Sequence, residues 1–580
     1  MNKLLYFLFC TSFSVLMLKA QSFQFKAADI DIAYHKYSLK NGLTLLVHED
    51  HKAPIAAVNV WYHVGSKNEK PGKSGFAHLF EHLMFNGSEN YNTDYFEALE
   101  RIGATDLNGT TNNDRTNYFQ NIPTSALDQV LFLESDRMGH LLGAIDQDRL
   151  EEQRNVVKNE KRENENQPYG MQWEYVVKAL YPKGHPYSWT VIGEMEDINA
   201  ATLEDVQQWF TSYYGAANAV LAIAGDVDPD EIYQKVVKYF GDIPSGPTIE
   251  RQEVNIPHKV YDSRQVYEDR VNETRVLFVW NTPEFGSRED LHFDLISSIL
   301  SSGKNSILYK KFVYEDQSAS RAAAFQSSSE IASRFVAYLN VIQGQDSGKL
   351  EKELWDEITK FIEEGPTEDE LKRVKAQYFA NFIKGLERIG GSGGVSDILA
   401  SNESYHGDAS YYKTQLKYIE DATVDDLKET AKKWLTKGKH ILVCNPFPDF
   451  TVDKPSIDRS KLPELGVQKS SSFPEIQRTT LSNGLKVIFA ERKGVPTMVL
   501  SLITDAVYKT DYLSSPGTAE LAMNLLDEGT AEKTALQINE QLQLLGASLS
   551  IYSNQDQSNM YMSTLKPSFD ESLALFADVL

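Results

Sequence analysis

The alternation of apolar and polar residues divides the first part of the chain into short strands and amphipathic helices. Asn41-Gly42 lies between two apolar runs, which is the pattern of a two-stranded hairpin. The run 56–64 predicts another strand, and 74–87 predicts a helix that Ser74 can cap and Gly87 can end. The same reading predicts helices at 93–102, 125–142, 146–165 and 202–214, a polar segment at 105–115, and strands at 118–122 and 219–224. We therefore expect one α+β domain over residues 34–250.

A second unit, residues 251–446, follows a similar order of elements. Its pattern predicts strands at 276–280, 335–341 and 440–443, and helices at 291–300, 349–361 and 368–386. The two units also end alike. Thr202 and Thr423 each open an acidic amphipathic helix that precedes a short apolar strand. Matching ends in units of similar size predict a duplicated αβ domain.

The last segment, residues 476–580, repeats the beginning of the first unit. Asn483-Gly484 again lies between apolar runs, and 518–530 aligns with 76–88 without a gap. The chain reaches Leu580 before this third copy completes a helical layer over its sheet, so we expect the natural protein to continue beyond it. The fold class predicted is α+β, with tandem duplicated αβ domains that each pair an antiparallel sheet with covering helices.

Two segments fall outside these domains. Residues 1–20 predict a signal peptide, with Lys3 before an apolar run and Ala20 as a small residue before cleavage. A membrane anchor is the alternative, although the run is short for a bilayer span, and no later segment predicts an integral span. Residues 447–475 are rich in Pro, Ser, Asp and Lys and predict a linker. We expect an exported protein, in a bacterium a periplasmic one, with membrane association left open.

Composition narrows the class of protein. The chain is 41% apolar with a formal charge of −24, which is typical of a globular protein and argues against a nucleic-acid partner. Cys10 lies in the predicted leader, so Cys444 is the only cysteine expected in the mature chain. Neither an intrachain disulfide nor a cysteine-based zinc site is then expected.

The predicted helix 74–87 carries the clearest chemistry. It contains His78-Leu79-Phe80-Glu81-His82, and four residues span slightly more than one helical turn. His78 and His82 therefore share one face, with Glu81 beside them. Two imidazoles one turn apart form half of a zinc site, in the reverse order of the H-E-x-x-H motif. A third ligand and one open coordination position are still required.

A second predicted helix contains the residue expected to be the third ligand. It reads Arg154-Asn155-Val156-Val157-Lys158-Asn159-Glu160. Together with H-x-x-E-H, it resembles the pitrilysin/insulinase family of zinc peptidases, which includes the mitochondrial processing peptidases. The resemblance implies one Zn²⁺ per chain with Glu160 as third ligand, and Glu163 is the alternative. It also implies a two-half clamshell, here with an incomplete second half. In the third copy Glu520, Met523 and Asn524 stand opposite His78, Glu81 and His82, so this copy is a degenerate one without the zinc motif.

The resemblance further implies a substrate strand. Asn108-Gly109-Thr110-Thr111 is similar to the family's N-A-x-T segment, whose edge pairs with the substrate backbone. Gly109 replaces the usual Ala, which we expect to loosen the strand. The alternative is that Asn108 and Thr111 are ordinary turn and strand residues without a binding role. Gln153 stands where several family members carry a Glu, which removes one carboxylate near the site.

The implied function is a zinc-dependent endopeptidase that hydrolyses peptides or unfolded polypeptides. Zinc lowers the pKa of a bound water and polarises the scissile carbonyl, with Glu81 as the general base. The alternative is a non-catalytic scaffold or assembly subunit of the same fold. The intact H-x-x-E-H and Glu160 favour the peptidase, because a scaffold has no use for them. The family's Arg and Tyr that hold the substrate carbonyl lie beyond this sequence, and an oligomer is left open.

Overall fold

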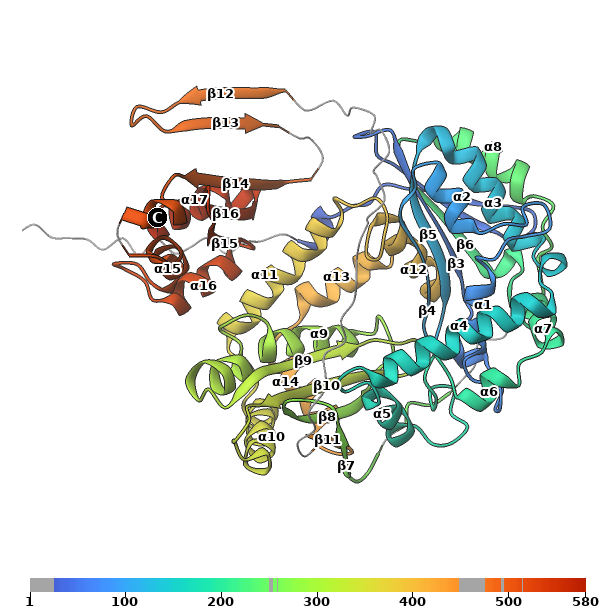
Figure 1. Cartoon of the computed structure of the whole chain (residues 1–580), viewed down its shortest axis with the longest axis horizontal. Coiled ribbons are helices and arrows are strands. Elements are labelled where there is room, and N and C mark those ends of the chain that lie inside the picture. The colour runs from blue at the N-terminus through green and yellow to red at the C-terminus, as the bar shows by residue number, and fades with distance from the viewer. Residues whose placement is uncertain (1–25, 250–253, 258, 448–474, 492–494, 514) are drawn as a thin grey trace, which may run out of the picture. The chain divides into compact units, whose positions relative to one another are not determined.

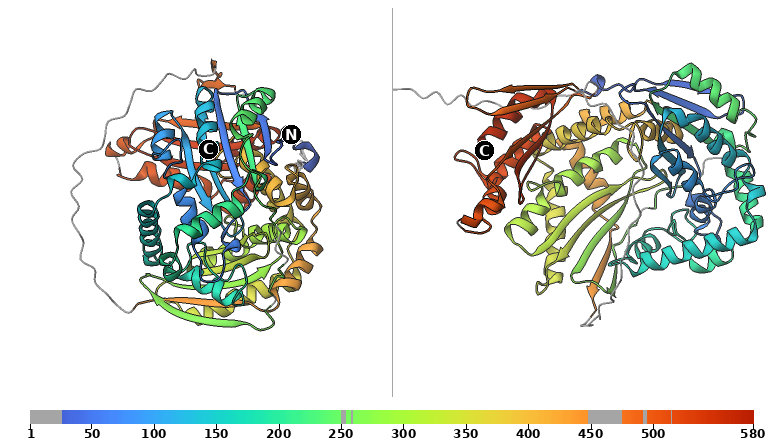
Figure 2. Two further views of the ribbon diagram at one scale, coloured as in Figure 1. Left: turned by 90° about the vertical axis from the view of Figure 1, so that its right-hand side faces the viewer. Right: turned by 45° about the horizontal axis from the view of Figure 1, so that its top comes forward.

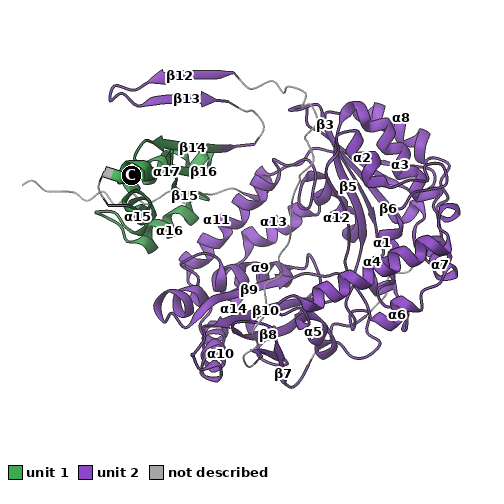
Figure 3. Cartoon of the chain, viewed as in Figure 1, with its two compact units in different colours: residues 1–24, 498–580 green, residues 25–497 purple. Residues whose placement is uncertain are grey.

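The computed structural model describes residues 26–249, 254–257, 259–447, 475–491, 495–513 and 515–580. The predicted signal peptide, and all of the predicted linker except its two end residues, lie outside the described residues. The chain forms two compact units, one spanning Phe25–Thr497 and one spanning Met498–Leu580 in its described part (Figure 3). Each is described here by itself.

A six-stranded sheet organises the first part of the larger unit (Figure 1). The strand order is β1-β2-β6-β3-β5-β4, so β4 is an edge strand. Neighbouring strands are antiparallel except β2 and β6, which are parallel. The expected hairpin is confirmed: β1 and β2 flank Asn41-Gly42, and Gly42 adopts φ 91°. The strands are β1 (His35–Ser38), β2 (Thr44–Glu49), β3 (Ile55–Tyr62), β4 (Thr105–Thr111), β5 (Thr116–Pro123) and β6 (Ala219–Gly225).

Amphipathic helices pack on this sheet and close its core. Side chains of the strands and of α1 meet in one buried cluster, which includes Val58, Val60, Leu79, Phe80 and Leu83. Burying the apolar face of α1 in this way leaves its polar face for other uses. The helices are α1 (Phe76–Leu83), α2 (Tyr95–Arg101), α3 (Leu127–Gly139), α4 (Gln147–Asn166), α6 (Met195–Asn199), α7 (Leu203–Tyr213) and α8 (Pro229–Phe240).

A second sheet repeats the topology of the first, which confirms the duplicated αβ fold. Its order β7-β11-β8-β10-β9 matches β2-β6-β3-β5-β4, and its first pair is again the parallel one. Figure 2 shows the orange β11 among green strands, as the green β6 lies among blue ones. The strands are β7 (Ser263–Asp269), β8 (Thr274–Thr282), β9 (Ala319–Ser327), β10 (Ser333–Val341) and β11 (His440–Pro446). The helices are α9 (Arg288–Ser301), α10 (Ser347–Glu364), α11 (Glu368–Gly385), α12 (Val395–His406), α13 (Tyr412–Asp421) and α14 (Val424–Leu435).

Each of the two domains contributes one helix that packs on the sheet of the other. Helix α5 (Gln172–Leu180) lies in the first sequence repeat but packs on the second sheet, where Val176 and Val177 join Leu277 and Val279 in one core. In return, α12 lies against β3 and β6 of the first sheet. The Asp397 carboxylate of α12 accepts hydrogen bonds from Asn59 Nδ2 (3.3 Å) and Trp61 Nε1 (3.2 Å). This exchange holds the two sheets of the larger unit together. The predicted boundary near residue 250 stays a prediction.

The third copy is visible in part. A hairpin, β12 (Ile476–Thr480) and β13 (Lys486–Ala490), forms around Asn483-Gly484. A three-stranded sheet of order β14-β16-β15 reproduces the β3-β5-β4 arrangement. Its elements are β14 (Thr497–Thr504), β15 (Ser548–Ser553), β16 (Ser558–Leu565), α15 (Thr518–Leu525), α16 (Ala535–Leu544) and α17 (Phe569–Val579). In the part of the chain that the structure describes, none of the helices has both the length and the apolarity that a bilayer crossing requires.

Candidate active site

Helix α1 begins differently from the sequence-based expectation. Its N-cap is Gly75 in a left-handed conformation (φ 83°), and the Ser74 hydroxyl donates to Asp197 Oδ2 (2.6 Å) instead of capping the helix. The buried carboxylate of Glu69 takes over that role, accepting from the backbone N–H groups of Gly75 (3.2 Å) and Ala77 (2.8 Å). The expected end at Gly87 is also wrong, because regular helix stops at Leu83. A carboxylate at the helix N-terminus accepts hydrogen bonds from free N–H groups, and its negative charge interacts favourably with the helix dipole.

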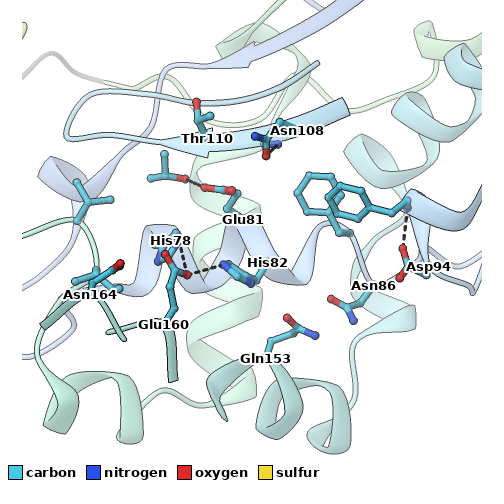
Figure 4. A pocket seen from close by; sticks show the side chains of 16 residues that line it. His78, Glu81, His82, Asn86, Asp94, Asn108, Thr110, Gln153, Glu160 and Asn164 are labelled. Carbon is cyan, nitrogen blue, oxygen red and sulfur yellow. Dashed lines mark hydrogen bonds and ion pairs between the residues drawn. The ribbon is translucent and has the colours of Figure 1, made fainter. Parts of the chain in front are cut away.

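Burial of the apolar face directs the two histidines outward from the core. His78 and His82 lie on one face with ring centroids 4.8 Å apart. Helix α4 packs against α1 and brings Glu160 to them. Glu160 Oε2 lies 3.6 Å from His78 Nε2 and 3.5 Å from His82 Nε2. Figure 4 shows the three side chains converging below Glu81.

This donor set fits a zinc ion. Tetrahedral zinc with N and O ligands at roughly 2.0–2.1 Å holds neighbouring ligand atoms about 3.3 Å apart, close to the distances observed. One ligand atom from each of His78, His82 and Glu160 can be chosen so that all lie within 4.8 Å of one another. Burial, reinforced by the neighbouring His82, lowers the pKa of His78 to about 4, so its ring is neutral at pH 7. The contact with His82 lowers the pKa of Glu160, which keeps it ionised.

Glu163, the alternative third ligand, lies apart from this cluster. Its side chain is exposed on α4 and does not line the pocket that contains the histidines. The structure thus brings Glu160 and not Glu163 to the imidazoles. The difference is a matter of helical phase, because three residues rotate a side chain by about 300° around the axis.

Glu81 points from α1 toward β4 (Figure 4). It is 7% exposed, and its Oε2 accepts a hydrogen bond from the Thr111 hydroxyl (2.5 Å). Burial raises the pKa of the Glu81 carboxyl. A carboxyl with a raised pKa beside a polar pocket is suited to take up and release a proton.

The edge strand β4 forms one wall of a pocket of about 600 Å³. Asn108, Gly109, Thr110 and Thr111 all line it, together with the histidines, Glu81 and Glu160. A Cβ on Gly109 would lie 2.8 Å from the Phe85 ring, so an alanine there requires that ring to move. Close packing, rather than a looser strand alone, thus accounts for the glycine.

Several pocket residues were not identified from the sequence. Among them, Phe85 and Phe96 stack with centroids 4.5 Å apart and form an apolar wall. Gln153, which the sequence placed near the site, lines the pocket from α4. Phe85 follows His82 by three residues, a spacing that could have placed it near the site. Asn164 follows Glu160 by four residues on α4, so the same argument from spacing applies to it. Phe96, Asp94, Val191 and Ile192 come from other segments and carry no local signal. Asn86 also lines the pocket.

Comparison with known proteins places the chain in a family. The family model described as Insulinase (Peptidase family M16) matches residues 44–188, and that described as Peptidase M16 inactive domain matches 200–378. "Zinc protease PqqE" of Helicobacter pylori (strain ATCC 700392 / 26695) is 29% identical over 411 residues, covering 69% of this chain and 90% of that protein. "Probable mitochondrial-processing peptidase subunit beta, mitochondrial" of Arabidopsis thaliana is 29% identical over 219 residues, 37% of this chain and 40% of that protein.

Solved structures give the same result. A protease from Helicobacter pylori has a TM-score of 0.67 at 28% identity and covers 71% of this chain and 99% of its own. The periplasmic protease PqqL from Escherichia coli has a TM-score of 0.59 at 16% identity over 95% of this chain and 66% of its own, which shows a shared fold. The chain therefore belongs to the insulinase family of peptidases, family M16, among whose members are proteins named zinc proteases.

Proposed function

We propose that this protein is a zinc-dependent endopeptidase in which His78, His82 and Glu160 hold one zinc ion. One observation carries the proposal: the Glu160 carboxylate oxygen lies 3.5–3.6 Å from the Nε2 atoms of two imidazoles, in a chain of a peptidase family. Peptides or unfolded polypeptides are the proposed substrates.

A zinc ion held by these residues supplies a Lewis acid for the scissile carbonyl and acidifies a water molecule. Glu81 acts as the general base and then passes the proton to the leaving amine. Its Oε2 is held by the Thr111 hydroxyl, which leaves Oε1 to take up the proton. Thr111 thereby fixes the orientation of the carboxylate.

We propose that the substrate backbone pairs with β4 in an extended conformation. Two facts support this: β4 is the edge of its sheet, and Asn108 to Thr111 line the same pocket as Glu81. An edge strand offers unpaired N–H and C=O groups that a peptide can complete. Such pairing requires an extended substrate backbone and depends less on the identity of the substrate side chains.

Zinc content and peptide cleavage, measured on matched variants of one helix, test the ligand assignment. Glu160→Ala is expected to lose stoichiometric zinc and cleavage together, because a third ligand is removed. Glu163→Ala is the control and is expected to retain both, because its side chain is exposed away from the pocket. A Glu160→Ala protein with full zinc and full cleavage would contradict the assignment. A wild-type protein that binds zinc but cleaves no peptide would favour the scaffold function.

We also propose that the protein is exported by a leader at residues 1–20. Lys3 followed by an apolar run that ends near Ala20 supports this. N-terminal sequencing of the mature protein is expected to find a start close after Ala20, and an intact Met1 would contradict cleavage.

A further inference from the structure

A second pocket, of about 230 Å³, adjoins the candidate active site. Val191 lines both pockets, so the two adjoin at this residue. The walls of the second one, called here the aromatic pocket, come from both αβ domains of the larger unit. They include Trp173, Tyr181, Tyr187, Trp189, Phe325 and Arg334.

Among the described residues that line this pocket, Arg334 alone has a charged side chain. Its guanidinium lies 5.5 Å from the ring centroid of Trp173. Among the described residues, no carboxylate forms an ion pair with it and no group accepts a hydrogen bond from its side chain. Two other arginines of the second sheet are engaged: Arg264 pairs with Glu351 (2.6 Å), and Arg275 Nε donates to Asn340 (2.9 Å). A half-buried guanidinium that lacks an acceptor is a ready partner for a carboxylate.

The pocket is also tied to the catalytic helix. Trp189 Nε1 donates to Glu69 Oε2 (2.7 Å), and Glu69 is the carboxylate that caps α1. A ligand against Trp189 is therefore held in a fixed relation to His78 and His82. Because Val191 lines both pockets, a peptide bound in the active-site pocket lies next to the aromatic pocket.

We propose that the aromatic pocket binds a carboxylate-bearing segment of the peptide substrate. Arg334 pairs with the carboxylate, and the aromatic walls hold an adjacent apolar side chain. The inference rests on the proposed peptidase function and adds a specificity to it. The charge of the protein supports this occupant. The chain carries a formal charge of −24, which repels acidic peptides in general. An acidic segment is therefore expected to bind at a local guanidinium such as that of Arg334. The carboxylate comes either from an Asp or Glu side chain or from the peptide C-terminus, since both present the same group.

Cleavage of matched peptides tests the proposal. One neutral sequence is made as a C-terminal amide, as a free acid, and as amides in which a single Glu replaces Gln at each position in turn. The wild-type protein is expected to prefer one Glu position, or the free acid, by about tenfold in kcat/KM, the size of one charged hydrogen bond. A Glu position identifies a side-chain carboxylate, and the free acid identifies the C-terminus. Arg334→Gln is expected to reduce the preference to about one.

Arg321→Gln is the matched control. Arg321 lies on the neighbouring strand β9, exposed and outside the pocket, with its guanidinium 5.7 Å from the ring centroid of Tyr338. This variant removes the same charge and is expected to keep the wild-type ratio. If Arg334→Gln also keeps it, or if the wild type shows no preference for any carboxylate, the proposal is overturned while the peptidase function stands.

A binding measurement separates the two hypotheses. The same peptides are titrated against Glu81→Gln, which is expected not to cleave them, and binding is followed by tryptophan fluorescence, to which Trp173 and Trp189 of the pocket contribute. The same roughly tenfold preference, lost on Arg334→Gln in this background, supports the pocket even if no peptide is cleaved. Equal affinities for acidic and neutral peptides overturn it, whatever the cleavage assay shows.

Discussion

Helices α1 and α15 occupy corresponding places in two copies of one domain and differ in chemistry. Both are eight residues long, Phe76–Leu83 and Thr518–Leu525, and both follow a left-handed glycine, Gly75 or Gly517. A carboxylate eight residues upstream of the second helical residue caps each one. Glu69 accepts from Ala77 N, and Asp511 accepts from Ala519 N.

The two helices share this cap but not the metal-binding and catalytic residues. Glu520, Met523 and Asn524 stand in α15 where His78, Glu81 and His82 stand in α1. Within the described residues, a cluster able to hold a metal is found only around α1. The glycine and the capping carboxylate therefore set where this helix begins, independently of whether it carries a site. The helix at this position therefore does not need the histidines and the glutamate in order to form, since α15 lacks them.

Transferring a residue from α15 into α1 gives the largest expected effect. His82→Asn copies Asn524 and is expected to abolish stoichiometric zinc binding and cleavage, because an amide is a poor substitute for an imidazole ligand. Metal analysis and a cleavage assay measure the two losses. The thermal unfolding midpoint without metal is expected to change little, because the His82 ring faces the pocket rather than the core. The reciprocal Asn524→His is expected to bind no zinc, and a zinc site gained there would contradict the distinction drawn between the copies.

A second contrast concerns one ion pair that both copies contain. Lys67 and Asp114 are 3.3 Å apart and buried, and Lys509 and Asp556, at the corresponding positions, are 3.4 Å apart and exposed. Only the buried pair extends to Glu330 of the second αβ domain. Glu330 contacts Lys67 Nζ and His63 Nε2, the latter at 2.6 Å.

The buried cluster predicts a pH-dependent stability. Burial opposes ionisation of Glu330, but the hydrogen bond from His63 and the charge of Lys67 outweigh it and lower the pKa of Glu330 to about 2. Because the folded pKa lies below the unfolded value, the stabilisation is complete above about pH 4.5 and is lost as the pH falls toward 2. Glu330→Gln is expected to cost up to about 3 kcal/mol at pH 7 and much less at pH 3. Urea unfolding of both proteins at several pH values measures this, and a cost that stays constant with pH would refute it.

The exposed pair predicts the smallest effect. Asp556→Asn removes the ion pair with Lys509, in which both side chains are well exposed to water. Solvent-exposed pairs of this kind contribute about 0–1 kcal/mol, so we expect a change in unfolding free energy of less than about 0.5 kcal/mol. The same urea experiment measures it. A loss as large as that of Glu330→Gln would show that exposure does not separate the two copies.

Much of the fold could be predicted from local sequence. The Asn-Gly hairpins, the helices at 93–102 and 146–165, and the repeat of element order each follow from short-range pattern, and the structure contains them. The pairing of His78 and His82 follows from helical geometry, and their proximity to Glu160 followed from the family motif.

The remaining features depend on contacts between distant residues. A helical pattern indicates that one face of α5 is buried, but not that the second sheet buries it. Adjacency to the helix predicts Ser74 as the cap of α1, whereas the cap is Glu69, which precedes Ala77 by eight residues in the chain. Arg334 and Trp189 have no sequence signal that joins them, and only the packing of the two domains brings them to one pocket.

The most direct test of the central claim is the cleavage rate of Glu81→Gln relative to the wild type, with zinc measured in both. Glu81 contributes no zinc ligand in this account, so the variant is expected to retain one zinc per chain. Its kcat is expected to fall by about 10²–10⁴-fold, the usual contribution of a general base. Equal cleavage by the two zinc-loaded proteins would contradict the account.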